Sequence, residues 1–197
     1  MSTGRLEAFS DGVLAIIITI MVLELKVPHE PTLAALAGLW PVLSSYVLSF
    51  IYIGIYWNNH HHLMAAADEV SGSILWANLH LLFWLSLLPF ATGWMGENHF
   101  GKWPTVFYGI DLLACAVAFY ILERRIIRAQ GERGRLARAL GDDFKGKASP
   151  LLYLAGIASA WLIEPWIGVT IFVGTALMWV VPDRRIEREV AQQIGED

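Results

Sequence analysis

The chain has 197 residues, of which 56% are hydrophobic and 16% are charged, and its formal net charge is −4. This composition is too apolar for an ordinary soluble domain, and the small negative charge gives no sign of a nucleic-acid partner. The apolar residues fall in blocks of membrane length, and lipid offers no hydrogen-bond partners to loops or sheet edges. We therefore expect an all-α integral membrane protein.

Six hydrophobic segments are predicted to cross the membrane as helices of one domain, residues 1–197. They cover about residues 6–27, 33–57, 74–95, 104–122, 150–163 and 166–181. Prolines mark several boundaries, because Pro28 and Pro31 follow the first span and Pro165 separates the last two in a tight hairpin. Pro41 lies inside the second span, where neighbouring helices can satisfy the freed carbonyl, and it predicts a kink.

The basic residues lie mainly on one side of these spans. That side carries Arg5, the linker 123–147 and the arginines after the last span, whereas the other side carries only Lys26 and Lys102. Lysine and arginine resist translocation, so both termini are predicted to be cytoplasmic, which requires an even number of spans. The basic linker could bind anionic lipid, although a topology signal is the simpler interpretation.

The first span carries a stripe of residues that includes polar groups. At 100° per residue, six side chains fall within about 40° of one line. They are Arg5, Phe9, Gly12, Ile16, Thr19 and Leu23. The stripe fits a helix seam, with close approach at Gly12 and Thr19 bonded to the Ala15 carbonyl, or a pore lined by several copies of the span. Spacing alone favours the seam.

Asp11 lies roughly 120° from this stripe and is expected to face the protein interior. A buried carboxylate is costly unless it is paired, so we expect a polar network near the cytoplasmic ends of the first three spans. The candidate partners are Arg5, Asn58, Asn59, His60, His61, His62, Asn78 and His80. Asp111, in the fourth span, has no obvious mate, and an interhelical hydrogen bond is expected there rather than a substrate site.

Three adjacent histidines also raise the possibility of a transition-metal site. Adjacent residues project in different directions on a helix, and the chain lacks the further histidine boxes of a membrane di-iron oxidase. Phosphate-binding glycine loops, nucleophile elbows and metalloprotease helices are also missing from the sequence. We therefore expect no enzyme activity, no metal and no cofactor.

The segment Arg5-x-x-x-Phe9-Ser10-Asp11, followed by Ala15, Ile16 and Thr19, resembles the transmembrane protein 175 family of potassium channels in its single-repeat prokaryotic form. Supporting matches are His60 to His62, Asn78, and Pro89-Phe90 at the end of the third span. The resemblance covers nearly the whole chain and implies a homotetramer in membrane lipid, in which the first helix of each subunit lines a central pore.

By position, the resemblance makes Ile16 the hydrophobic constriction, Thr19 the selectivity layer and Leu23 the next aliphatic ring. It also implies a structural or gating network. The members of that network are Arg5, Phe9, Ser10, Asp11, His60, His61, His62 and Asn78. Some family members carry a small hydroxyl residue at the position of Ala15, which implies a thinner polar lining here.

The sequence therefore predicts a potassium-preferring cation channel of a prokaryotic plasma membrane, with potassium as the permeant ion. The alternative is a proton-coupled secondary transporter that uses Asp11, Asp111 and the histidines as a relay. The network itself could be a structural clamp on the first helix, or a gate latch that responds to cytoplasmic pH through its histidines.

Overall fold

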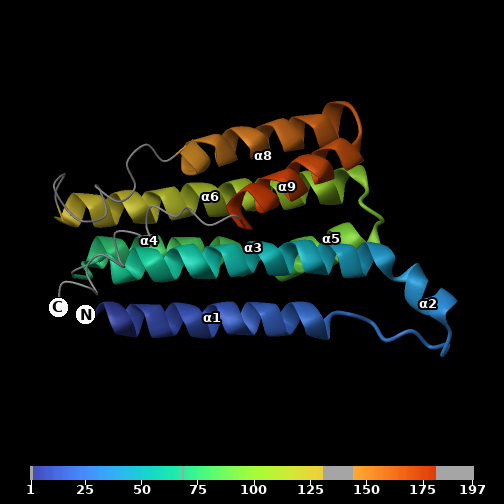
Figure 1. Ribbon diagram of the computed structural model, residues 1–197, viewed down its shortest axis with the longest axis horizontal. Helices are drawn as coiled ribbons and strands as arrows, with labels where there is room; N and C mark the ends of the chain where they lie inside the picture. Colours follow the sequence, from blue (N-terminus) through green and yellow to red (C-terminus); the bar gives the residue numbers. More distant parts are fainter. Residues whose placement is uncertain (1, 68, 131–143, 181–197) are drawn as a thin grey trace.

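The computed structural model describes residues 2–67, 69–130 and 144–180, and every regular element in these ranges is a helix. Figure 1 shows the long helices running side by side as an elongated bundle. The elements are α1 (Thr3–Leu23), α2 (Leu33–Gly38), α3 (Trp40–Ala65), α4 (Gly72–Leu85), α5 (Leu88–Glu97), α6 (Lys102–Gln130), α8 (Phe144–Leu162) and α9 (Pro165–Val180).

Within the described ranges, four helical segments are long and apolar enough to cross a membrane. These are Thr3–Leu23, Trp40–Ala65, Gly72–Glu97 and Lys102–Ala129. The sixteen residues of α9 form a shorter apolar helix, about 24 Å long against a hydrocarbon core of about 30 Å. The chain is therefore a multi-pass membrane protein by length and composition, and four of the six predicted spans have full membrane length.

The second span differs from its prediction at both ends. Residues 33–38 form the separate short helix α2, whose first turn is capped by Thr32, and α3 starts at Trp40. Pro41 stands in the first turn of α3, where the missing N–H has no helical partner to lose. It thus marks the start of a helix, and the predicted kink is wrong. At its other end α3 continues to Ala65, so the three histidines lie within the helix instead of after it.

The predicted linker 123–147 is helical at both ends. Helix α6 continues to Gln130 and α8 already begins at Phe144, while residues 131–143 lie outside the described part of the chain. Pro150 lies inside α8 instead of opening it. The third span is divided at Pro89, which stands in the first turn of α5. The turn 86–87 joins α4 to α5.

Helix α1 lies at the edge of the bundle, where it packs on α3, α4 and α5, whereas α8 and α9 pack on each other and on α6 (Figure 1). A polar cluster ties the central helices, because the Ser49 hydroxyl lies 2.6 Å from that of Thr92 and 2.9 Å from that of Tyr108. Tyr52 donates a 2.6 Å hydrogen bond to the Phe172 carbonyl and so joins α3 to α9. Phe172 is fully buried.

One end of the bundle carries an aromatic cluster. The Trp40 ring stacks at 5.8 Å on both Phe100 and Trp166, and so joins the starts of α3 and α9 to the turn before α6. Tryptophan is typical of the membrane–water interface. At the same end the Lys26 ammonium lies 2.5 Å from the Glu97 carboxylate, and this hydrogen bond raises the pKa of Lys26 above its usual value.

Candidate functional site

Helix α1 presents two different faces. Leu6, Ser10, Leu14, Ile17 and Met21 are buried against the rest of the subunit. They recur every three or four residues, which places them on one side of the helix. Because Ser10 is part of this face, α1 brings a hydroxyl group into the subunit interior near its N-terminal end.

The opposite face is the predicted stripe, and each of its residues is exposed. Three apolar members have large exposed fractions, 52% for Phe9, 60% for Ile16 and 76% for Leu23. The Thr19 hydroxyl donates a 2.8 Å hydrogen bond to the Ala15 carbonyl. A side chain at Gly12 would meet nothing within 4 Å, so this glycine makes no close helix contact in the described subunit. Spacing alone favours a packed helix seam. The stripe is instead left uncovered by the other described helices of the chain.

A buried chain of hydrogen bonds joins α1, α3 and α4. The Asn78 amide nitrogen donates to the Ser10 hydroxyl at 2.9 Å, and its carbonyl oxygen lies 2.7 Å from His60 Nε2. Ser10 donates in turn to the Leu6 carbonyl at 2.9 Å. All three polar side chains are at most 2% exposed. The structure therefore brings together the predicted residues Ser10, His60 and Asn78.

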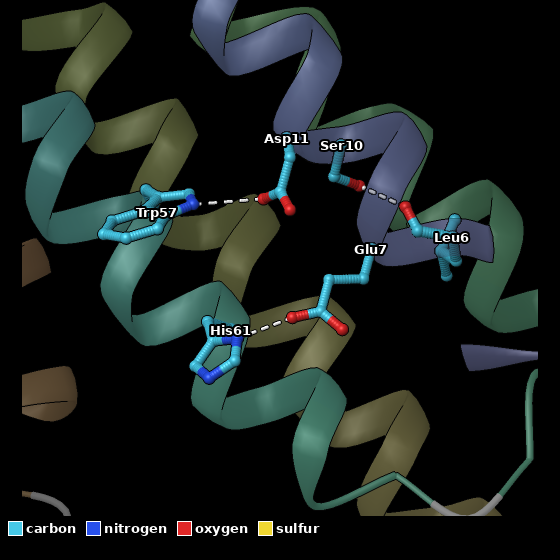
Figure 2. A network of polar contacts seen from close by, with 6 residues as sticks. All are labelled: Leu6, Glu7, Ser10, Asp11, Trp57 and His61. Atoms are coloured by element: carbon cyan, nitrogen blue, oxygen red, sulfur yellow. Dashed lines mark hydrogen bonds and ion pairs between the residues drawn. The ribbon is translucent and has the colours of Figure 1, made fainter. Parts of the chain in front are cut away.

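Two further contacts join α1 to α3 in the form of a ladder (Figure 2). The Trp57 indole N–H donates a 3.1 Å hydrogen bond to Asp11, and His61 Nδ1 lies 2.6 Å from the Glu7 carboxylate. The acidic residues are four apart on α1 and their partners are four apart on α3. Each pair therefore lies on one face of its helix, which lets two antiparallel helices meet at two points.

Trp57 and Glu7 are absent from the predicted network. Asp11 is only half-buried, whereas a buried carboxylate is expected from the sequence, and its partner is an indole, which is not among the charged and amide candidates considered there. The matching spacing of Glu7 and Asp11 with Trp57 and His61 is the signal that could have identified both pairs.

Other candidate partners of Asp11 lie elsewhere. Arg5, one of the candidate partners of Asp11, is exposed and forms no salt bridge with any described carboxylate. Asn59 donates to the Ile55 carbonyl of its own helix, and His80 accepts a hydrogen bond from Trp84. The His62 ring lies 5.6 Å from that of His61.

The interhelical hydrogen bond predicted for Asp111 is not formed among the described residues. Asp111 is 2% exposed in the first half of α6, and neither carboxylate oxygen has a hydrogen-bond partner in this part of the chain. A relay that passes from Asp111 to the histidines through direct hydrogen bonds is thus not formed in this part of the chain. Nor does any group of three histidine, cysteine or acidic side chains within residues 2–67, 69–130 and 144–180 come close enough to hold a metal ion.

Comparison with known proteins gives concordant matches in sequence and structure. The family model described as "Endosomal/lysosomal potassium channel TMEM175" matches residues 5–89. A potassium channel of Chryseobacterium sp. (strain P1-3) is 53% identical over 192 residues, which cover 98% of this chain and 100% of the relative. A potassium channel of Chamaesiphon minutus is 32% identical over 184 residues, or 85% of this chain and 88% of the relative.

The fold is also similar to a solved structure. The crystal structure of a lysosomal potassium-selective channel TMEM175 homolog from Chamaesiphon minutus aligns with a TM-score of 0.80 at 29% sequence identity. The alignment covers 91% of this chain and 96% of that one. The similarity thus extends over nearly all of both chains.

Proposed function

Because the chain belongs to the TMEM175 family of potassium channels, we propose that four copies of it form a potassium-preferring channel whose pore is lined by α1. The family consists of channels, so the protein is a potassium channel and not an enzyme, and ion conduction needs no cofactor. We propose a prokaryotic plasma membrane as its location, with six spans in each subunit and both termini cytoplasmic.

The observation that carries the pore proposal is the exposed stripe on α1. Of the four membrane-length segments, α1 has the highest mean hydropathy, yet only 28% of its span is buried in the subunit, against 50% for α6. A helix face that contains the charged Arg5 is a poor surface for lipid, and the Thr19 oxygen, whose proton is bound to the Ala15 carbonyl, still has lone pairs that lipid cannot bind. Identical copies around an axis would cover this face and give its polar groups water or ions.

In this arrangement the stripe forms successive rings along the axis. Four Ile16 side chains make a narrow hydrophobic neck, which excludes water when it is tight and thus gates ion flow. Thr19 lies about one turn further along and supplies oxygens that replace part of the hydration shell of an ion. Leu23 adds a second aliphatic ring. Selectivity should be moderate, since hydroxyls do not form the full carbonyl cage of ordinary potassium channels.

The network on the other face of α1 is proposed to hold the pore helix in place. Ser10, Asn78 and His60 fix its buried side, while Asp11 and Glu7 attach it to α3. Arg5 and Phe9 share the exposed side and would stand at the cytoplasmic mouth of the pore. The network therefore acts as a clamp that sets the orientation of the stripe.

The selectivity proposal is tested with purified protein in liposomes under opposed potassium and sodium gradients. Thr19→Ala should move the reversal potential toward zero, because the ring loses its oxygens. Thr170→Ala is the matched control, since Thr170 is an exposed threonine of α9 that also bonds to a carbonyl four residues earlier. An unchanged reversal potential in Thr19→Ala would remove this residue from the selectivity layer.

The gate is tested separately with Ile16→Asn. The polar side chain should wet the neck and raise single-channel conductance, whereas Ile110→Asn on the exposed side of α6 should leave the conductance unchanged. Loss of current in Ile16→Asn with intact assembly would count against the hydrophobic neck.

A further inference from the structure

An apolar groove lies between α6 and α8, away from the proposed pore helix. Its volume is about 520 Å³. Its walls include Trp103 and Val106 of α6 and Leu154, Ile157, Trp161 and Leu162 of α8. Several of these side chains are well exposed, up to 75% for Leu162. Because α6 is a membrane-length helix, a surface of this kind lies at the depth of lipid chains and needs an apolar occupant.

The cationic side chain of Lys102 stands beside the groove. The Lys102 ammonium lies 4.5 Å from the centre of the Trp161 ring, and that ring meets Trp103 edge-on at 4.5 Å. The cation–π contact positions the ammonium above the apolar walls. An ammonium has three N–H donors and no acceptor, so it can still bind an anionic oxygen in this position.

The two lysines at this end of the bundle differ in their surroundings. Lys26 is bound to Glu97, whereas Lys102 has no carboxylate within salt-bridge distance in the part of the chain that the structure describes. The charge of Lys102 is therefore available to a ligand. Trp103 and Trp161 beside it are typical of the level at which lipid headgroups begin.

We propose that this groove is a binding site for an anionic phospholipid, whose acyl chain lies along α6 and α8 and whose phosphate binds Lys102. The charge of the lipid complements the unpaired ammonium, and the apolar walls match its chain. In the proposed orientation the lipid belongs to the outer leaflet. The site does not depend on which face of α1 lines the pore.

The test is native mass spectrometry of the full-length protein in detergent, titrated with phosphatidylglycerol and phosphatidylcholine of identical acyl chains. The wild-type protein should prefer phosphatidylglycerol. Lys102→Gln should weaken phosphatidylglycerol binding about fivefold, the effect expected for one lysine near an anionic headgroup, and leave phosphatidylcholine binding unchanged. Lys102→Arg should keep the preference, and Trp161→Ala should weaken the binding of both lipids.

Lys26→Gln is the matched control, because it removes a lysine that already has a carboxylate partner at the same end of the molecule. A preference that survives Lys102→Gln, or that falls equally in Lys26→Gln, would overturn the site. A second copy of the chain in the groove would also overturn it. That outcome would appear as a covalent dimer when a photoreactive amino acid replaces Leu154, because such a probe bonds to any neighbouring chain that fills the groove.

Discussion

Helices α1 and α6 are both long apolar segments, but the subunit uses them in opposite ways. Helix α6 is covered by α4, α5, α8 and α9, and Leu112 and Cys115 are fully buried in it. Helix α1 has neighbours on one side only and exposes its other side. Hydropathy places both helices in the membrane, but only the pattern of burial separates a helix that its neighbours cover more fully from one that leaves a face uncovered.

The largest expected effect is on the free energy of unfolding, when one leucine of each helix is replaced by alanine. Leu112→Ala should lower the free energy of unfolding by about 2–5 kcal/mol, because it leaves a cavity in a packed core. Leu23→Ala should change it by about 0.5 kcal/mol or less and act on conductance instead, since this side chain is 76% exposed. Thermal unfolding in one detergent measures both. Equal destabilisation by the two substitutions would mean that the stripe is a structural surface.

A second prediction concerns the buried side of α1. Asn78→Ala should lower the free energy of unfolding by about 1–3 kcal/mol. The substitution removes the Asn78 amide from a buried site, where it binds both His60 Nε2 and the Ser10 hydroxyl. Asn98→Ala is the control, since the exposed Asn98 side chain donates to the Trp94 carbonyl four residues earlier. The same unfolding measurement applies. If both variants lose the same stability, the hydrogen-bond chain does not anchor α1.

The smallest expected effect is that of the Glu7–His61 contact. Glu7→Gln should lower the free energy of unfolding by about 1 kcal/mol or less, because both groups are partly exposed and water screens their attraction. The same thermal unfolding measurement applies.

Glu97→Gln provides the comparison at the other end of the bundle. It removes a carboxylate from the Lys26–Glu97 pair, which is more exposed than Glu7 and His61, so its loss of stability should be no larger. A loss in Glu7→Gln as large as that in Asn78→Ala would mean that the buried hydrogen-bond chain is not the main anchor of α1.

Hydropathy and proline positions predict much of the fold, because lipid restricts the chain to helices. The first, third and fourth spans follow directly from their apolar blocks. The start of α3 does not, since Pro41 is compatible with both a kinked helix and a first turn, and packing decides between them. The ends of α6 and α8 extend into the basic linker, where hydropathy no longer marks a boundary.

Some features of the candidate site could likewise be predicted from the sequence, and others could not. Helical periodicity identifies the stripe and the inward direction of Asp11 because both are properties of one helix. The partners of Glu7 and Asp11 depend on how α1 and α3 are aligned, and a single sequence contains no direct measure of that alignment. Asp111 shows the same limit, because its lack of a hydrogen-bond partner depends on helices distant in the sequence.

The bond from Thr19 to the Ala15 carbonyl has a consequence for the sign of the permeant charge. It occupies the only proton of the hydroxyl, so the side of the oxygen that is turned away from the helix carries only lone pairs. A ring of four such oxygens in the proposed pore would attract positive ions and offer chloride no donor. Discrimination against anions would then need no acidic residue in the pore.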